Sequence, residues 1–365
     1  MSPLATPTLQ PAAGSVFEYY FPHVFGADTS ATPSAIVVRV NETLPTATAA
    51  PIETATPTPI PTIVPTPLPT IAVDDAIRFG YKLGVNCVDD YDVRSGANYA
   101  ATLGAPVIVV YISKSAAVEL KQRYPRTMVV YRPFLNDVGN NLAELIKRLE
   151  LSPGDPAMFY LGHNENEIGI DLSPDGIRAR AAFDIQVAQH LKDRQPNSIY
   201  LAGSFAHGTP DFTNPEVCRA IKESYAPAYN RGLLWMDLHN YTLGRRFPTH
   251  PPAGAGIVDT IWYERRWQWL FTNCGFDPTV RHIVASETGV EAGSGGFASA
   301  GYSEAQLTDW LIDYRRTQLT PLMVNGRAYP SPFRFGALFQ FGNNSRWHGY
   351  DLRSFESALV TEWRR

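Results

Sequence analysis

From residue 79 to the C-terminus, apolar runs of strand length alternate with amphipathic segments of helix length. This alternation is expected of consecutive βα units that build one parallel sheet. Eight strands are predicted, over residues 79–87, 106–112, 128–134, 157–165, 198–205, 233–241, 282–288 and 335–341. Predicted helices include residues 141–151, 174–193, 215–229, 262–274 and 303–318. Eight such units match a (β/α)8 TIM barrel, so residues 76–365 are predicted to form one α/β barrel.

The alternative for such a pattern is an open, doubly wound parallel sheet. That fold usually carries a glycine-rich phosphate loop directly after its first strand. Here the first predicted strand runs into Asn86-Cys-Val-Asp-Asp90, which contains no glycine. A closed barrel is therefore preferred.

The first 75 residues differ in composition from the rest of the chain. Residues 43–70 are mostly Thr, Pro and Ala, and such a run favours extended polyproline II because proline fixes φ and removes backbone donors. We therefore predict a docking segment at 1–43, a linker or stalk at 44–75, and the barrel from 76. The stalk is either a semi-rigid spacer or an O-glycosylated tract. The predicted glycosylation sites are Asn41, within a sequon, and Thr56, Thr58, Thr62 and Thr66.

Two β-prone pieces precede the Thr/Pro tract, at residues 16–25 and 35–40. Both are rich in aromatic and β-branched residues, which predicts one or two short strands. Neither is long enough to bury itself, so each seeks an edge or groove. They either pack on their own barrel or dock into a neighbouring copy. The second alternative predicts a homo-oligomer or filament held together through residues 15–43.

Charge and hydropathy exclude several classes of partner. The net charge of −4 and the isoelectric point near 6.1 provide no basic field for nucleic acid. Apolar stretches long enough to span a membrane are absent, so no membrane span is predicted. The start of the chain lacks the pattern of a signal peptide. An extracellular or cell-surface location is nevertheless expected from the stalk.

The chain has three cysteines, Cys87, Cys218 and Cys274, without the CxxC spacing of a zinc or redox centre. No cofactor and no metal are predicted. In the expected barrel, Cys218 begins one helix near the top and Cys274 ends another near the bottom. This placement predicts that the two lie beyond disulfide reach, so that all three act as small buried hydrophobic residues.

Polar side chains gather where the predicted strands end. In a TIM barrel the carboxyl ends of the strands form the functional face. The third strand ends with Arg132, the fourth with His163-Asn-Glu165, the sixth with Asp237-Leu-His-Asn-Tyr241 and the seventh with Ser286-Glu287. We expect these residues to meet at one face.

Two of these strand ends carry a family resemblance. Tyr160-Leu-Gly-His-Asn-Glu165 resembles the fourth-strand motif of clan-A glycoside hydrolases, in which an Asn-Glu pair carries the acid/base. Ile283-Val-Ala-Ser-Glu-Thr-Gly289 is similar to their seventh-strand motif, which carries the nucleophile. The resemblance covers residues 76–365 in motif order and strand number. It implies a TIM barrel that cleaves glycosidic bonds with retention, with Glu165 as acid/base and Glu287 as nucleophile.

The chemistry explains why two carboxyl groups are needed. Glycosidic cleavage requires a proton for the departing oxygen and a negative charge against an oxocarbenium-like centre, and retaining enzymes hold the two groups about 5 to 5.5 Å apart. The resemblance implies that Asn164 binds a sugar hydroxyl and that His239 and Tyr241 bind the nucleophile or the substrate. Arg132 is a candidate to orient Glu287, and Trp347 to stack on a sugar ring. The alternative is an ion pair with Arg132 that merely ties strand ends together.

Three functions remain open from the sequence. The first is a retaining glycoside hydrolase that acts on carbohydrate and is carried on a stalk. The second is a structural subunit of a glycosylated extracellular filament, in which the barrel is catalytically silent or only binds sugar. The third is a carbohydrate-binding module that binds sugar without forming product.

Overall fold

A computed structural model of the protein describes residues 81–88, 93–111, 113–135, 138–139, 141–165, 171–206, 208–243, 265–291, 296–342 and 345–365. The predicted docking segment, stalk, short N-terminal strands and glycosylation sites lie outside these residues, and so they stay predictions. The same holds for the filament contact through residues 15–43.

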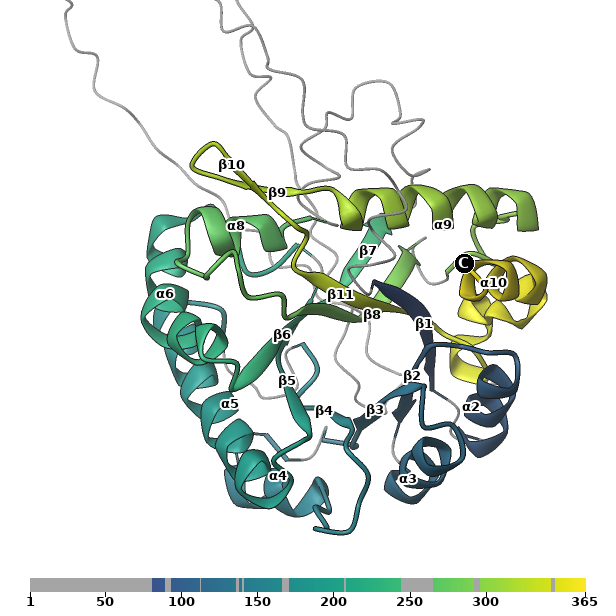
Figure 1. Ribbon diagram of the computed structural model, residues 1–365, viewed down its shortest axis with the longest axis horizontal. Coiled ribbons are helices and arrows are strands. Elements are labelled where there is room, and N and C mark those ends of the chain that lie inside the picture. The colour runs from purple at the N-terminus through teal and green to yellow at the C-terminus, as the bar shows by residue number, and fades with distance from the viewer. Residues whose placement is uncertain are drawn as a thin grey trace, which may run out of the picture. The chain divides into compact units, whose positions relative to one another are not determined.

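Eight parallel strands form a closed barrel, as the sequence predicts. They are β1 (Lys82–Cys87), β2 (Val107–Tyr111), β3 (Met128–Arg132), β4 (Phe159–Leu161), β5 (Ile199–Phe205), β6 (Leu234–Leu238), β8 (Ile283–Glu291) and β11 (Phe333–Phe339). Neighbours along the chain pair in order, and β11 pairs with both β1 and β8, which closes the ring. Figure 1 shows the strands in the centre with helices around them. The open sheet is therefore excluded.

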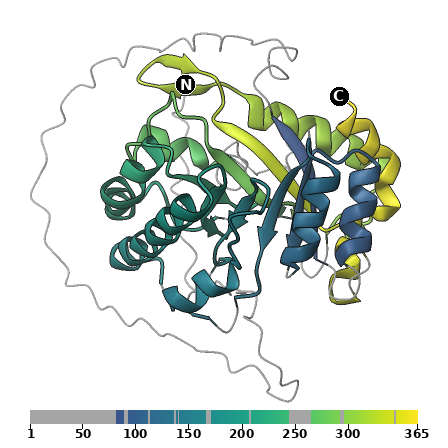
Figure 2. The same ribbon diagram turned by 60° about the horizontal axis from the view of Figure 1, so that its bottom comes forward.

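Helices cover the outside of the barrel between successive strands (Figure 2). They are α2 (Val93–Thr102), α3 (Lys114–Arg123), α4 (Leu142–Arg148), α5 (Pro174–Arg194), α6 (Pro215–Asn230), α8 (Trp267–Thr272), α9 (Glu304–Leu319) and α10 (Glu356–Trp363). Local sequence sets several starts: Ser173 and Asn214 cap α5 and α6 ahead of a proline, and Ser303 forms a capping box with Gln306. Among the described helices, none combines the length and apolarity needed to cross a bilayer.

Smaller elements complete the fold. A short antiparallel pair, β9 (Leu322–Val324) and β10 (Arg327–Tyr329), lies between α9 and β11 in the chain. Beyond β11, the chain forms two short 3-10 helices, Ser345–Tyr350 and Leu352–Phe355, before α10. The strand β7 (Asn240–Leu243) follows β6 after a single residue and pairs with the far end of β8.

The core has an inner and an outer layer, because side chains on a strand alternate between the two faces. Val107 and Val109 lie in the cluster inside the barrel, with Leu161, Leu201 and Phe335. Their neighbours on β2 belong to the larger cluster between strands and helices. Strands buried on both faces require continuous apolar runs, which explains why the strands were readable from sequence.

One sequence prediction is wrong: Cys218 and Cys274 form a disulfide, with their Cα atoms 4.8 Å apart. The prediction assumed a helix over 262–274 that runs the height of the barrel. The helix α8 spans only Trp267–Thr272, about 9 Å at 1.5 Å per residue, so its end stays near the start of α6. In the chain-entropy description, a link across 56 residues stabilises the fold by about 4 kcal/mol. Cys87 is buried, as expected.

Candidate active site

A β-bulge in β8 sets the position of Glu287. Asp237 pairs with Val284, whereas Asn240 pairs with Thr288. Between these two pairs, the β6–β7 side has two residues, 238 and 239, and β8 has three, 285 to 287. The pairing of β11 with β8 shifts over the same stretch. An extra residue of this kind bends the strand and redirects a side chain, so the bulge explains how Glu287 is aimed.

Glu287 has a full set of partners. Its side chain is only 9% exposed. The guanidinium of Arg132, at the end of β3, forms an ion pair with Oε1. The hydroxyl of Tyr241, on β7, donates to Oε2 over 2.9 Å. His239 Nδ1 lies 3.6 Å from the same Oε2. The carboxylate is thus held by side chains from β3, from β7 and from the residue that links β6 to β7.

Glu165 lies beyond the short strand β4 and is more open. Its side chain is 32% exposed. Its backbone has φ 46°, a left-handed conformation that is uncommon outside glycine. The backbone N–H donates to the Ser204 carbonyl over 2.9 Å, and the carboxylate Oε1 lies 3.0 Å from His239 Nδ1.

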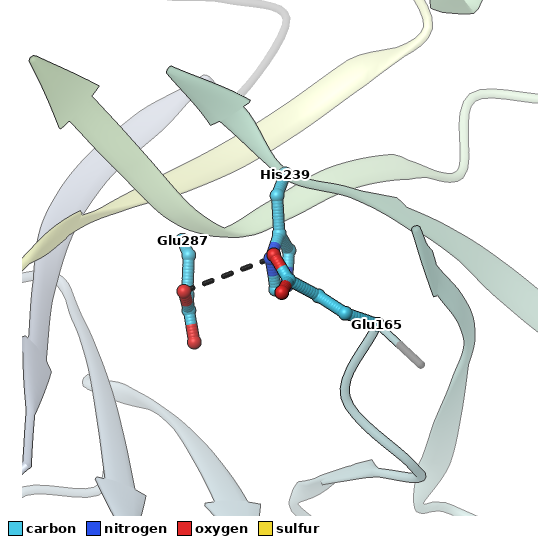
Figure 3. Close-up of side chains that lie close together, drawn as sticks. All are labelled: Glu165, His239 and Glu287. Atoms are coloured by element: carbon cyan, nitrogen blue, oxygen red, sulfur yellow. Dashed lines mark hydrogen bonds and ion pairs between the residues drawn. The ribbon is translucent and has the colours of Figure 1, made fainter. Parts of the chain in front are cut away.

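The two carboxylates converge on one histidine. Figure 3 shows Glu165 reaching from the side opposite Glu287, with His239 between them. An oxygen of Glu165, an oxygen of Glu287 and a ring nitrogen of His239 all lie within 4.8 Å of one another. The strand ends thus bring two acids, far apart in sequence, face to face.

Burial and charge act in opposite directions on His239. Complete burial lowers the pKa of the imidazole, whereas the charges of Glu287 and Glu165 and the hydrogen bond to Glu165 raise it. The raising contributions together outweigh burial, so the pKa of His239 is raised. The pKa of Tyr241 is also raised, by burial and by the charge of Glu287, so its hydroxyl remains a donor at neutral pH. Arg132 additionally stacks over the Tyr111 ring, 4.8 Å from its centroid.

The sequence placed Asp237 at a strand end but assigned it no role in the site. Asp237, next to the last residue of β6, accepts hydrogen bonds from the backbone N–H and the hydroxyl of Ser286, over 2.7 and 2.6 Å. It also accepts from Ser204 over 2.8 Å. These bonds fix Ser286, which precedes Glu287, and Ser204, whose carbonyl accepts the N–H of Glu165. The available signal was an acid inside an otherwise apolar strand, Leu234-Trp-Met-Asp-Leu238.

Two predicted residues contribute less to this geometry. Trp347 lies in the 3-10 helix after β11, where its ring packs edge-on against Phe339 and Tyr350 at 5.3 and 5.7 Å. The Gln340 amide donates to the Trp347 carbonyl over 3.3 Å. Asn164 is half-buried beside Glu165 in the chain. The stacking and sugar-binding roles of these two residues stay predictions.

The donor set of the site resembles that of a metal centre. Two carboxylates and one imidazole, from Glu165, Glu287 and His239, are chemically suited to a divalent cation. However, the Arg132 guanidinium already pairs with Glu287, and a cationic His239 would repel a second positive charge. The arrangement fits proton transfer and nucleophilic attack better than metal binding.

Comparisons with known proteins agree with the fold. No protein-family profile matches the chain, and no curated protein sequence matches it. Among solved structures, it is similar to a GH39 enzyme from Xanthomonas axonopodis pv. citri, with 12% identity, a TM-score of 0.49, and coverage of 78% of this chain and 66% of that chain. It is also similar to Bacteroides uniformis β-glucuronidase 2, covalently bound to cyclophellitol-6-carboxylate aziridine, with 14% identity, a TM-score of 0.48, and coverage of 78% and 35%.

A third similar structure is an endo-1,4-β-mannanase from Eisenia fetida, with 12% identity, a TM-score of 0.45, and coverage of 78% of this chain and 91% of that chain. The chain thus spans about a third of the β-glucuronidase and just under two thirds of the GH39 enzyme. These neighbours are clan-A glycoside hydrolases with a TIM barrel, the family that the strand motifs resemble. At these identities the similarity concerns the fold alone.

Proposed function

We propose that the protein is a retaining glycoside hydrolase that acts on a carbohydrate substrate. One observation carries the proposal: carboxylate oxygens of Glu165, four residues beyond β4, and of Glu287, within β8, lie within 4.8 Å of each other. A separation this short suits direct attack by one carboxylate, whereas inverting enzymes need room for a water, about 6.5 to 9.5 Å.

In this proposal Glu287 is the nucleophile. The bulge in β8 aims its carboxylate, and Arg132 and Tyr241 fix both oxygens. These bonds hold the attacking oxygen before substrate arrives, so little reorganisation is needed at the moment of reaction. Attack on the anomeric carbon forms a glycosyl-enzyme ester and releases the leaving group.

Glu165 acts as acid and then as base. In this proposal the Glu165–His239 pair carries one proton, shared across the 3.0 Å between Oε1 and Nδ1, and the two glutamate charges favour it by raising the pKa of His239. Glu165 passes this proton to the departing oxygen, which leaves its carboxylate hydrogen-bonded to a neutral His239 imidazole. In the second step Glu165 takes a proton from water, which hydrolyses the ester. Its one-third exposure gives the leaving group and water access.

The remaining predicted residues bind substrate in this proposal. Asn164 would hold a sugar hydroxyl beside the acid, and Trp347 would contact a sugar ring. The Cys218–Cys274 disulfide supports an extracellular location, because such bonds persist in oxidising compartments.

The test combines trapping with stereochemistry. The protein is incubated with activated 2-deoxy-2-fluoro glycosides of common hexoses and pentoses, digested, and analysed by mass spectrometry. The expected result is one added sugar on the peptide that contains Glu287. Proton NMR of early hydrolysis product should show the anomeric configuration of the substrate. A label on another residue, or an inverted product, would contradict the proposal.

A further inference from the structure

A buried arginine outside the barrel reaches the backbone of Glu165. Arg180 lies in α5 and is 1% exposed. Its guanidinium donates to the carbonyl oxygens of Glu165 and Gly203, and to that of His163 over 3.1 Å. It also stacks over the Phe205 ring at 5.1 Å. A buried charge is usually matched by a carboxylate, so its use on three backbone carbonyls requires an explanation.

The backbone explains why these carbonyls need a donor. The strand β4 has three residues, and its ladder with β5 ends at Leu161 and Leu201. Beyond that point Gly203, Ser204 and Glu165 all have positive φ, at 88°, 40° and 46°. A left-handed run cannot continue the strand ladder, and buried carbonyls without partners are costly. Arg180 supplies the missing donors.

Arg180 has an acidic neighbour on the same helix. Asp184, one helical turn later on α5, accepts from the hydroxyls of Tyr200 and Tyr225 over 2.9 and 2.6 Å, and from the Gly203 N–H over 3.0 Å. Asp184 and Arg180 also interact electrostatically. The helix α5 thus presents two opposite charges, and both bind the backbone of Gly203 in β5. Arg180 also binds the segment that ends at Glu165.

We propose that Arg180 is a positioning residue for Glu165. By fixing the backbone carbonyl of Glu165 in its left-handed conformation, it sets the direction from which the carboxyl group approaches His239 and the leaving group. The inference rests on the proposed function, since it assigns Arg180 to the acid/base side of that reaction. Within the described residues, the hydrogen bonds of Arg180 go to the β4–β5 side, whereas Glu287 is held by Arg132 and Tyr241.

Because Arg180 binds the segment of Glu165, its substitution should affect the acid/base step and leave the nucleophile in place. A displaced acid matters for a leaving group that needs a proton and hardly matters for one that departs as a stable anion. Arg180→Lys and Arg180→Gln are compared with wild type on 4-methoxyphenyl and 2,4-dinitrophenyl glycosides. We expect kcat/KM on the first substrate to fall about 10- to 100-fold, part of the range for general acid catalysis. Formation of the glycosyl-enzyme from the second should change by less than about threefold.

Arg315 provides a control on another pair of helices. It lies in α9 with its side chain 15% exposed, and its guanidinium pairs with the buried Glu362 of α10. Arg315→Lys should lower the rates on both substrates by the same factor, as a general loss of stability would. If Arg180→Lys behaves like Arg315→Lys, the positioning role is wrong.

A second measurement does not depend on activity. Amide hydrogen exchange is followed for the peptide that covers residues 159–165 in Arg180→Gln and Arg315→Gln. We expect faster exchange there in the Arg180 variant alone. Equal exchange in the two variants would overturn the inference, whatever the wild type hydrolyses. Failure of the proposed function appears differently, as wild-type protein that neither cleaves nor becomes labelled while the exchange difference persists.

Discussion

The ends of β4 and β8 each present one glutamate, but they hold it in different ways. The strand β8 has nine residues, and Glu287 lies within it, 9% exposed and contacted by Arg132, His239 and Tyr241. The strand β4 has three residues, and Glu165 lies four residues beyond it with 32% of its side chain exposed. One carboxylate is built into the sheet, and the other is carried on a loop.

The contrast matches the chemistry proposed for each residue. A nucleophile must attack one carbon atom along one line, so it gains from rigid support. An acid/base must serve a leaving group in one step and water in the next, so it gains from exposure and some freedom. The same contrast predicts how each site responds when its glutamate is changed.

The largest effect is expected at β8. Glu287→Gln keeps the size of the side chain but removes the nucleophile and leaves the Arg132 charge unmatched. We expect kcat to fall by more than the roughly 10²–10⁴-fold that general acid–base catalysis contributes. The loss should be similar for every leaving group. Initial rates on 4-methoxyphenyl and 2,4-dinitrophenyl glycosides measure it.

A surface variant controls for the charge change itself. Glu216→Gln removes an exposed glutamate on α6 that pairs with Arg219, three residues later. Its activity should equal that of wild type. Substantial turnover in Glu287→Gln, on any substrate that wild type cleaves, would remove Glu287 from the mechanism.

Glu165→Gln should give a smaller and more selective loss. Without the acid, hydrolysis of a poor leaving group should fall about 10²–10⁴-fold. Glycosyl-enzyme formation from a 2,4-dinitrophenyl substrate should be almost unchanged, and added azide should restore turnover because it needs no general base. A loss that is equal for both leaving groups would mean that Glu165 and Glu287 have the same kind of role, and the contrast between the strands would fail.

Much of this arrangement follows from local sequence patterns. The apolar runs predicted the eight strands because both faces of each strand are buried. The strand-end positions of Glu165 and Glu287 predicted that they meet at one face, since all carboxyl ends of a parallel barrel share it, and the resemblance to clan-A glycoside hydrolases implied that they form a pair. Arg132, His239 and Tyr241 were identified by the same argument, and the structure brings all three together with Glu287.

The supports of the site depended on facts that no local pattern contains. The bulge in β8 is a register shift between strands, and Asp237 acts through Ser286, 49 residues away. Arg180 contacts a carbonyl 15 residues back in the chain, across a segment between strand and helix. The Cys218–Cys274 disulfide was predicted to be impossible because the length of α8 was overestimated.

The hydroxyl of Tyr241 provides a smaller test of the difference between the two glutamates. The Tyr241 hydroxyl donates to Glu287, so Tyr241→Phe should act on the nucleophile side. A hydrogen bond to a charged group is worth about 1.5–3 kcal/mol, which corresponds to roughly 10- to 150-fold in kcat/KM. The loss should not depend on the leaving group. A leaving-group-dependent loss would instead connect Tyr241 to the acid.

The smallest effect concerns His239, which contacts both carboxylates. Because its pKa is raised in the folded protein, the folded state holds this proton at a pH where the unfolded state has released it. The stabilisation is therefore complete below the ordinary histidine pKa of about 6.5 and is lost as pH rises through the higher folded pKa. Urea unfolding at a series of pH values measures this decline.

Each carboxylate contributes to that raised pKa, so each substitution should move the decline in stability to lower pH. Glu165→Gln removes a hydrogen bond and a charge, and Glu287→Gln removes the largest favourable charge. His239→Gln should abolish this component of the pH dependence altogether. If the decline in stability persists unchanged in His239→Gln, the imidazole is not the group that titrates. The proton proposed for the Glu165–His239 pair would then reside elsewhere.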